Sequence, residues 1–558
     1  MHVAPVILFI YNRPAHLSAV INSLKKNKLA IETDLIVFSD GPKSDQDIKN
    51  VEACRSIIND QDFFFKSLTR HYSQSNQGLS TSIINSLNKI FETHEQAIIL
   101  EDDLICSEYF LEFMNKYLNY YKDAHDVLSI HAYSYPIHNE LPDVFFLKGA
   151  DCWGWGTWKR GWQLFNPNAK ALYEELVKTD QLNYFDYNGK APFSRLLKKV
   201  VKNQSQSWAI RWHASAVLQN KLTLYSKLSF IKNIGNDASG THSKKSDIYC
   251  TEIADFVPHE TPLPEHSAAA YNQFSSFFKK NSSKFDHCYL FLFHNYNSIW
   301  MKIRKWTYNI AHARKISFNG PYESWSKALD NSTGYDSDNI INKTLESTKQ
   351  VIDGIAVYER DSRLFHSPAN EPIVANFLSD LPKNSRIIDF GGGLASLYFR
   401  HKEILHTKVN LEWHIIEQPK FIAAAKQLNF PSHIYFHRSI HDELENSTAL
   451  IFSNSLQYIE SPMELLDKVI NHQEHQILFF RMLPTAELSI QRCFVQKVPS
   501  NIYEASYPIW VFSLSLLLSK IEKFYTVTTI EFESTSHSTY TGLEIRYVNI
   551  IAKKKNRI

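Results

Sequence analysis

The sequence predicts an α/β protein built from two doubly wound domains, and three observations lead to this prediction. The chain has 558 residues, more than one hydrophobic core usually supports. Apolar runs alternate twice along it with amphipathic segments, which favours two mainly parallel sheets. Each series contains a motif directly after a strand: three acids at Glu101–Asp103 and three glycines at Gly391–Gly393. We expect domains over residues 1–245 and 316–558, joined by a linker with short helices over 246–315.

The first series begins at the N-terminus. The expected elements are the strand Val6–Ile10, the helix Ala15–Leu24, the strand Leu35–Phe38, the helix Gly78–Phe91 and the strand Ala97–Leu100. Parallel sheets bind ligands at the carboxyl ends of their strands. The polar residues that follow these strands should therefore meet at one edge and bind a ligand; they are Asn12, Arg13, Asp40, Glu101, Asp102 and Asp103.

A tryptophan-rich stretch follows over 151–162 and continues at 208–212. The glycines between the aromatic residues favour a shaped loop over a regular element. Each indole has two roles open to it, packing in the core or contact with the C–H face of a sugar, and core packing is the commoner one.

The second series has the same alternation. The expected elements are a helix through Glu371–Leu378, the strand Arg386–Asp389, a helix from Ser396, the strand Trp413–Ile416, the helix Lys420–Gln427, the strand Thr448–Phe452, the helix Pro462–Ile470 and the strand Gln476–Phe480. This order predicts a second doubly wound domain with its own ligand site.

Composition excludes several classes of protein. The 60 basic and 58 acidic residues nearly cancel, so no general field for nucleic acid is expected. The six cysteines form no C-x-x-C pair, which argues against a zinc site or a disulfide framework. The apolar stretches at Tyr289–Phe293 and Trp510–Leu518 are too short or too interrupted to span a bilayer. We expect a cytoplasmic protein, and peripheral contact with the inner face of the membrane stays open.

The acidic run predicts a cation site. Adjacent carboxylates at the end of a buried strand repel one another unless a divalent cation shares them. Mg²⁺ or Mn²⁺ bound there would bridge an acid to the diphosphate of a nucleotide-sugar. The alternative is a solvated acidic turn.

A series of motifs sharpens this hypothesis. In order they are Ile7-Leu8-Phe9-Ile10-Tyr11-Asn12-Arg13-Pro14, Val37-Phe38-Ser39-Asp40-Gly41, Glu101-Asp102-Asp103-Leu104, Gly154-Trp155, Trp208 to Trp212 and Gly240-Thr241-His242. Together they resemble the GT-A glycosyltransferases related to N-acetylglucosaminyltransferase I, over about residues 4–245. The resemblance implies a GT-A fold and a nucleotide-sugar donor, most simply a UDP-sugar. It also implies that Arg13 and Asp40 hold the nucleoside, Asp102 faces the ribose or sugar, Asp103 ligates the metal and Glu101 faces the sugar.

One departure leaves the catalytic base open. That family has its catalytic aspartate in a W-D-D-W motif, whereas this chain has no carboxylate in Trp208-Ala209-Ile210-Arg211-Trp212. An inverting displacement needs a group that takes the proton of the acceptor hydroxyl. The unranked candidates are Asp151, His213 and Asp237. His242 is a candidate to meet the metal or the diphosphate.

The glycine turn predicts a second cofactor site. Gly391 and Gly393 stand where a strand turns into a helix, so that backbone can approach a ligand closely. Glu417 follows the next strand, where a carboxylate can accept the ribose hydroxyls of either NAD or S-adenosylmethionine.

Two resemblances favour S-adenosylmethionine. The pattern Asp389-Phe390-Gly391-Gly392-Gly393 and the later strand end around Asn454 look like class I methyltransferases. Tyr335-Asp336, Phe365-His366-Ser367 and Tyr507-Pro508-Ile509-Trp510 resemble, over about 320–555, methyltransferases found beside surface-polysaccharide genes. Asp389, Gly391, Gly393, Glu417 and Asn454 would then bind the cofactor. His366, His441 and Tyr458 are candidates for a base.

These expectations combine into a bifunctional enzyme of surface-polysaccharide synthesis. A metal-dependent glycosyltransferase would extend a glycan or lipid-linked glycan, and a fused methyltransferase would modify the product. Two alternatives keep the first activity and change the second domain, to a non-catalytic interaction module or to an NAD-dependent sugar oxidoreductase.

Overall fold

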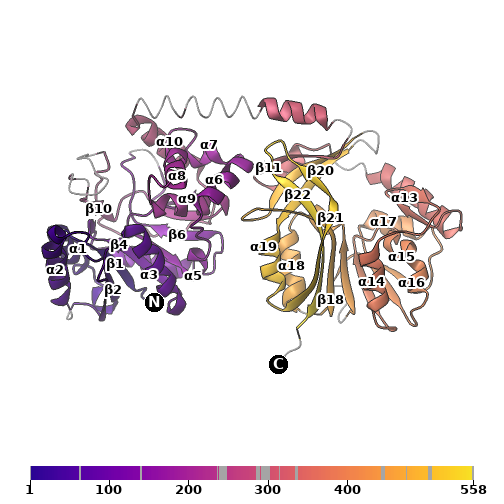
Figure 1. The fold of residues 1–558 in the computed structure, drawn as a ribbon, viewed down its shortest axis with the longest axis horizontal. Helices are drawn as coiled ribbons and strands as arrows, with labels where there is room; N and C mark the ends of the chain where they lie inside the picture. The colour runs from indigo at the N-terminus through magenta and orange to yellow at the C-terminus, as the bar shows by residue number, and fades with distance from the viewer. Residues whose placement is uncertain are drawn as a thin grey trace. The chain divides into compact units, whose positions relative to one another are not determined.

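The chain forms two compact units, Met1–Ile299 and Trp300–Ile558, in a computed structural model (Figure 1). The structure describes residues 2–61, 64–137, 141–235, 237, 248–283, 290, 302–312, 315–333, 337–440, 447–472, 474–499 and 505–555. None of the helices in these ranges combines the length and the apolar character needed to cross a membrane.

Unit 1 contains an eight-stranded mixed sheet in the order β3-β2-β1-β4-β8-β6-β9-β7. Its strands are β1 Val6–Ile10, β2 Asp34–Ser39, β3 Ser67–Tyr72, β4 Gln96–Glu101, β6 Val127–His131, β7 Val144–Lys148, β8 Trp155–Trp158 and β9 Leu222–Ser226. The first four are parallel, and β8 runs antiparallel between β4 and β6. Two short strands, β5 Leu104–Cys106 and β10 Ile231–Asn233, pair beside the sheet.

Helices cover both faces of this sheet. They are α1 Pro14–Leu24, α2 Asp45–Asn59, α3 Leu79–Thr93, α4 Phe110–Tyr120, α5 Lys159–Trp162, α6 Ala169–Lys178, α7 Leu182–Phe185, α8 Phe193–Val201, α9 Trp208–Leu218 and α10 Ala268–Asn281. Alternate residues of β1 face opposite sides, as the strand period requires. Val6 and Leu8 pack with α1, α2 and α4, while Ile7 and Phe9 pack with α3, α5 and α9.

The tryptophan-rich stretch is regular structure, so the expected loop over 151–162 is wrong for its second half. Residues from Trp155 onward form β8 and α5, and Trp208 begins α9. The ring centroid of Trp155 lies 5.6 Å from that of Trp208 and 5.4 Å from that of Trp212. All three side chains are buried, which confirms core packing as their role.

Part of the expected linker belongs to the core of unit 1. Tyr271, Phe274 and Phe278 of α10 pack in one cluster with Phe145 and Leu147 of β7. The aromatic residues of α10 therefore complete a hydrophobic core that β7 alone would leave exposed. The sequence suggested a linker here because Pro, Ser and Lys interrupt the pattern on both sides of this helix.

Unit 2 contains a ten-stranded sheet with a parallel centre, β16-β15-β14-β17-β18. These strands are β14 Arg386–Phe390, β15 Glu412–Ile416, β16 Ile434–His437, β17 Ala449–Ser453 and β18 Ile477–Ala486. Strand β22 Glu544–Lys554 pairs antiparallel with both β18 and β21 Tyr525–Ser538. The last residues of β18 also pair with β20 Ala505–Ser513, which continues through β19 Arg492–Val498 to β11 Ser317–Tyr322.

Helices cover both faces of this sheet as well (Figure 1). They are α12 Trp325–Asp330, α13 Ser337–Ile352, α14 Pro372–Asp380, α15 Ser396–Arg400, α16 Lys402–Leu405, α17 Pro419–Ala425, α18 Pro462–His472 and α19 Leu514–Ile521, and a hairpin of β12 Tyr358–Arg360 with β13 Arg363–Phe365 precedes α14. Ile387 faces α14 to α16, and Ile388 faces α18 and α19. The α/β class with parallel-rich sheets is confirmed, whereas the antiparallel strands were not expected.

Candidate active sites

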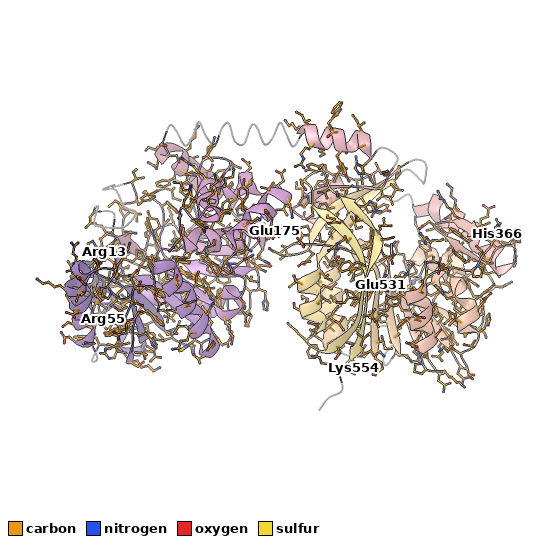
Figure 2. The ribbon with its side chains drawn as sticks, viewed as in Figure 1. Arg13, Arg55, Glu175, His366, Glu531 and Lys554 are labelled. Carbon is orange, nitrogen blue, oxygen red and sulfur yellow. The ribbon has the colours of Figure 1, made fainter. Side chains whose placement is uncertain are left out.

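The carboxyl edge of the unit 1 sheet brings the loops after β1 and β4 together. The backbone N–H of Tyr11 donates to Asp102 Oδ2 over 2.9 Å. Arg13 Nη1 donates to Asp103 Oδ2 over 3.0 Å, and each of these two side chains is 19% exposed. Figure 2 marks Arg13 at this end of unit 1. The expected meeting of these residues at one edge is therefore present in the structure.

The acidic run Glu101–Asp103 has more negative charge than the nearby positive side chains offset. Burial, followed by the charges of Asp103 and Asp102, raises the pKa of Glu101 to about 8. Burial and the charge of Asp103 raise the pKa of Asp102 to about 6, against the hydrogen bond from Tyr11. Burial also raises the pKa of Asp103, although Arg13 opposes it. A bound cation would relieve the repulsion that these shifts report.

A third loop closes against Asp103. The N–H of Ile234 donates to the backbone oxygen of Asp103 over 2.9 Å. A Cβ on Gly235 would overlap the carboxylate of Asp103, so a larger residue here would require that side chain to move. Further along, Asp237 Oδ2 lies 3.2 Å from His16 Nε2. His242, the candidate for the metal or diphosphate, lies outside the described residues.

Asp40 and Asn12 are engaged in local structure. Asp40 is 8% exposed, and its carboxylate accepts hydrogen bonds from the backbone N–H groups of Gly41, Gln77 and Gly78 at 2.8 to 2.9 Å. Asn12 Nδ2 donates to Asp47 Oδ1 over 2.7 Å. Asp40 thus shapes the edge by joining the loops after β2 and β3, a role that the sequence analysis did not anticipate.

We predict that Asp40→Ala lowers the free energy of unfolding of unit 1 by about 3 kcal/mol, because one buried and two partly buried N–H groups lose a charged acceptor. Urea denaturation measures this loss. Asp45→Ala, an exposed acid in the first turn of α2, is the matched control and should change stability little. Equal stability of the two variants would contradict the role of Asp40 in joining the loops after β2 and β3.

Of the three candidates for the base, Asp151 is held in place by two hydrogen bonds. Its Oδ2 accepts from the Tyr135 hydroxyl over 2.9 Å, and its Oδ1 accepts from the N–H of Cys152 over 2.8 Å. His131 Nε2 lies 3.9 Å from the same Oδ1. Burial, followed by the charges of Asp151, Glu101 and Asp103, raises the pKa of the Cys152 thiol. Cys152 therefore lies within electrostatic reach of both Asp151 and the acidic run.

His213 is a core residue. It is 5% exposed and packs among Phe185, Tyr187 and Phe193. Its Nδ1 lies at hydrogen-bonding distance from the backbone of Ala150. Burial, its largest influence, lowers the pKa of His213. These core contacts do not favour His213 as the base, one of the three candidates that the sequence left open.

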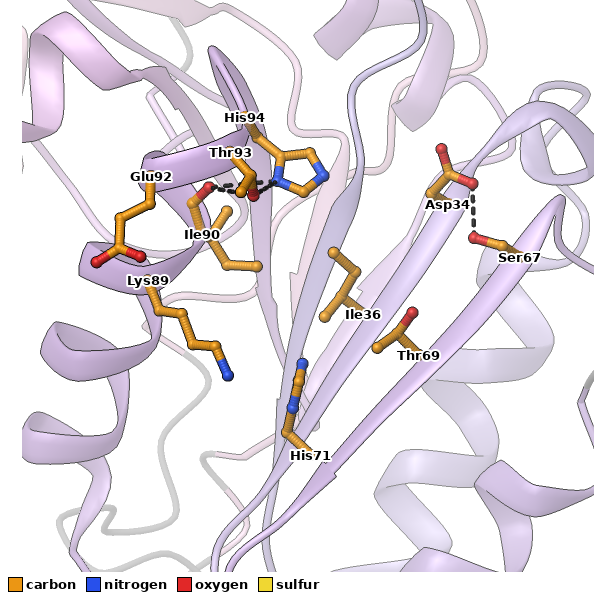
Figure 3. A pocket seen from close by; sticks show the side chains of 10 residues that line it. All are labelled: Asp34, Ile36, Ser67, Thr69, His71, Lys89, Ile90, Glu92, Thr93 and His94. Atoms are coloured by element: carbon orange, nitrogen blue, oxygen red, sulfur yellow. Dashed lines mark hydrogen bonds between the residues drawn. The ribbon is translucent and has the colours of Figure 1, made fainter.

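Within the described part of the chain, no three His, Cys, Asp or Glu side chains are grouped to hold a metal ion by themselves. The structure also has a cavity of about 310 Å³ elsewhere in unit 1. Figure 3 shows it between the side chains of β2 and β3 and those at the end of α3, with His71 opposite Lys89. None of the residues expected from the sequence to bind a ligand lines this cavity.

In unit 2 the glycine turn has one packed position and one open position. Gly391 has φ +71°, and a Cβ there would lie 2.6 Å from Ser455 Cβ. Gly393 has φ +59°, and a Cβ there would meet nothing within 4 Å. Gly391 thus allows two loops to touch, which corrects the expectation that it admits the ligand, whereas Gly393 borders open space.

Glu417 lies directly over this turn. Its Oε1 accepts from the N–H of Gly393 over 3.0 Å, and its Oε2 accepts from the N–H of Gln418 over 2.8 Å. Burial raises the pKa of Glu417, and these two hydrogen bonds oppose that shift. The carboxylate predicted 24 residues beyond Gly393 therefore contacts the glycine turn.

Buried polar groups without partners cluster under the same turn. Asp389 is fully buried, and neither of its carboxylate oxygens has a hydrogen-bond partner of normal geometry. Burial raises the pKa of Asp389 to about 7, although the nearby indole of Trp413 lowers it; the charge of Glu417 adds to the rise. Ser455 Oγ and Gln457 Oε1 are buried and unpaired too. Such groups are rare in native interiors and indicate a missing partner.

The other residues expected in this site differ in position. Asn454, at φ +56°, accepts from Gln457 Nε2 over 2.6 Å at the end of β17. The hydroxyl of Tyr458 donates to Gln496 Oε1 over 3.2 Å. His366 is exposed on the surface of unit 2 (Figure 2). His441 lies outside the described residues.

A charged cluster that the sequence did not predict is centred on Glu371, directly before α14. Arg481 Nη2, Arg400 Nη1 and His401 Nε2 lie 2.7, 3.1 and 3.2 Å from its carboxylate. Burial alone would raise the pKa of Glu371, but the hydrogen bond from His401 and the charges of Arg481 and Arg400 lower it to about 2. Pro372 marks the helix start in the sequence, yet nothing there points to Arg481, 110 residues away.

We predict that Glu371 stabilises unit 2 above about pH 4.5 and that this contribution, about 3 kcal/mol, is lost as the pH falls toward about 2. The sign follows because the pKa is lower in the folded state than in the unfolded state. Denaturation of the wild type and of Glu371→Ala between pH 2 and 7 tests it. Their stabilities should converge at low pH, and a constant difference would contradict the prediction. Glu403→Ala, an exposed acid of α16, is the control.

Comparisons with known proteins give matches among solved structures alone. No family model matches the chain, and no curated protein matches it in sequence. The N-terminal domain of EvdMO1, solved in the presence of SAH and D-fucose, matches with a TM-score of 0.26 and 11% identity over 40% of this chain and 98% of that one.

Two further matches are methyltransferases by name. A SAM-dependent methyltransferase from Methanosarcina mazei matches with a TM-score of 0.25 and 16% identity over 34% of this chain and 99% of its own. The N-methyltransferase NodS from Bradyrhizobium japonicum, in complex with S-adenosyl-L-homocysteine, matches with a TM-score of 0.24 and 12% identity. The match covers 38% of this chain and 100% of NodS. At these scores, the chemistry of this chain has to be argued from its own strand order and site residues.

Proposed function

We propose that unit 2 is a methyltransferase that uses S-adenosylmethionine. The observation that carries this proposal is the placement of Glu417 over the glycine turn, with open space beside Gly393. A carboxylate in that position can accept both ribose hydroxyls of the cofactor when it releases the two backbone N–H groups. The parallel centre of the sheet, with β22 antiparallel between β18 and β21, supports the proposal because class I methyltransferases share this arrangement.

The residues present fit this cofactor better than they fit NAD. Asp389 lies buried beneath the turn with unpaired oxygens, and its negative charge suits a ligand that carries a sulfonium and an ammonium group. The same charge would repel the pyrophosphate of NAD. The cofactor supplies an electrophilic methyl group when it is bound. The chain's own part is to hold the ribose at Glu417, to exclude water and to orient an acceptor atom. Most of the rate acceleration would come from placing that acceptor atom close to the methyl group.

We predict that Gly393→Ala weakens S-adenosylmethionine binding at least about tenfold, because the new methyl group enters open space where the ligand would lie. Both Gly393→Ala and Gly391→Ala strain the backbone, since both glycines have a positive φ. Gly391→Ala should destabilise unit 2 more, because its methyl group also meets Ser455. Calorimetry and thermal denaturation separate the two effects. Unchanged affinity in a folded Gly393→Ala would contradict the proposal.

Glu417→Ala should weaken the same binding by about 1–3 kcal/mol, the value of charged hydrogen bonds to the ribose. Glu412→Ala, at the opposite end of β15, is its control. Titration of NAD into the same proteins distinguishes the oxidoreductase alternative, and binding of neither cofactor would favour the non-catalytic module.

We infer further that unit 1 is a glycosyltransferase of the GT-A type. The supporting observation is the acidic run at the carboxyl edge, with Arg13 on Asp103 and raised pKa values in Glu101 and Asp102. Mg²⁺ is commonly bound by one or two carboxylates together with substrate phosphates, so a site without a protein cage fits a metal held jointly with a nucleotide diphosphate. Such an ion would offset the charge of the leaving nucleotide.

The base is best assigned to Asp151. Tyr135 fixes one of its oxygens, and the loop that carries it begins the strand beside β4. A carboxylate so placed can take the proton of an acceptor hydroxyl as that oxygen attacks the sugar. With a UDP-sugar donor and a glycan acceptor, the two units would act in sequence on one product. Their covalent link would raise the local concentration of that product at the second site.

We predict that Asp103→Asn removes most of the Mn²⁺ dependence of UDP binding, about tenfold or more in affinity, because the metal loses a charged ligand and the side chain keeps its size. Calorimetry with and without Mn²⁺ measures it. Asp126→Asn, whose side chain is 78% exposed, is the control. A retained Mn²⁺ effect in Asp103→Asn would contradict the metal role.

A further inference from the structure

A short helix at the start of unit 2, residues 302–311, belongs to a segment with an unusual charge pattern. The sequence has no Asp or Glu between Asp286 and Glu323. The same stretch contains the cations Lys302, Arg304, Lys305, Arg314 and Lys315. The chain as a whole is nearly neutral, so this positive charge is local.

One face of the helix is attached to unit 2. Among residues 302–311, Tyr308 alone is buried, at 8% exposure. Its hydroxyl accepts from the N–H of Phe318 over 3.1 Å, and burial raises the pKa of that hydroxyl. Lys305 Nζ lies 5.5 Å from the ring centroid of Tyr540. The side of the helix that carries Tyr308 and Lys305 therefore faces the protein.

The opposite face is apolar and exposed. Ile303, Trp306 and Ile310 are 47%, 65% and 58% exposed. At 3.6 residues per turn, Trp306 and Ile310 lie about 160° around the helix from Tyr308, and Ile303 lies about 140° from it. Together the three residues form an apolar stripe that points away from unit 2. Single exposed apolar residues are ordinary, whereas a row of three on one helix face calls for a partner.

We propose that this stripe, formed by Ile303, Trp306 and Ile310, docks unit 2 on a lipid bilayer with anionic headgroups. A basic helix with an apolar face that includes Trp lies in the interface of such a bilayer, with its apolar side chains among the acyl chains and its cations near the headgroups. Lys302 lies on the stripe's side of the helix, about 120° from Tyr308, and its long side chain can reach the headgroups.

A second copy of the chain fits this surface less well. Three side chains on one short helix bury far less area than a stable interface between proteins requires. In a two-fold contact Lys302, the cation on the stripe's side of the helix, would also face its own copy and repel it. The acid-free flanks favour a negatively charged partner, which an anionic bilayer provides.

The test uses the full chain and vesicles of phosphatidylcholine, with or without phosphatidylserine, in a sedimentation assay. The wild type should bind vesicles that contain phosphatidylserine and should not bind vesicles of phosphatidylcholine alone. Added salt should weaken the binding to the anionic vesicles. Trp306→Ser combined with Ile310→Ser should weaken it at least about tenfold without a change in thermal stability. Lys302→Gln combined with Lys315→Gln should weaken it about tenfold.

Leu329→Ser and Lys383→Gln are the matched controls, because both side chains are exposed on unit 2 outside this segment. Neither should alter vesicle binding. Equal binding by wild type and the stripe variant, or no binding to anionic vesicles, would overturn the proposal. So would a dimer that Trp306→Ser dissociates, or a fall in the thermal stability of unit 1 in that variant, since each outcome would identify another occupant of the stripe.

Discussion

Both sheets bury carboxylates at the carboxyl ends of their central parallel strands, and the loops around them are built to approach those carboxylates closely. In unit 1 the approach is made by Arg13 and Gly235 around Asp103. In unit 2 a Cβ on Gly392 would lie 2.5 Å from Asp389, so the turn rests directly on that side chain. Negative charge that is buried or partly buried with few partners is costly in the protein alone. It becomes favourable when a cationic group or a metal with its ligand is bound, and the proposed functions follow from this.

The two units handle their buried charges differently. The acidic run of unit 1 has Arg13 as its ion-pair partner among the described side chains, and its pKa values rise. Glu371 in unit 2 is paired with Arg400 and Arg481, and its pKa falls. Removing one member of such a buried group leaves the others unpaired, so the Glu371 cluster is a stabilising feature of the fold. Among the described side chains, the acidic run and Asp389 have fewer partners than Glu371 has.

Much of the fold was predictable because the spacing of apolar residues that marks a strand or a helix can be read within a short stretch of sequence. The expected strand Arg386–Asp389 and helix Pro462–Ile470 agree with β14 and α18 to within two residues at each end. The antiparallel strands β19 to β22 were missed, although β19 pairs with β20 and β21 pairs with β22 across short connections. Strand β21 is mostly exposed and polar, so it lacks the apolar run by which the central strands were recognised. The tryptophans of α9 showed why residue type alone fails: the same indole serves a core or a sugar site, and burial decides between them.

The position of a residue was predictable where it stands directly after a strand, as with Asp102, Asp103 and Glu417. The partners of its side chain were not predictable. Asp40 follows a strand as expected, yet three backbone N–H groups use its carboxylate. His213 carried no sequence sign that Phe185 and Phe193 enclose it. Asp151, Tyr135 and His131 come together only through the sheet order that joins β6 and β8.

Hydrogen exchange on the full chain with and without S-adenosylhomocysteine tests the central claim most directly, because it reports ligand contact segment by segment. The ligand should slow exchange in residues 389–396 around the glycine turn and in 413–418 around Glu417, and leave 98–104 in unit 1 unchanged. Protection in neither segment of unit 2, or the same protection from NAD alone, would contradict the assignment of that site to S-adenosylmethionine.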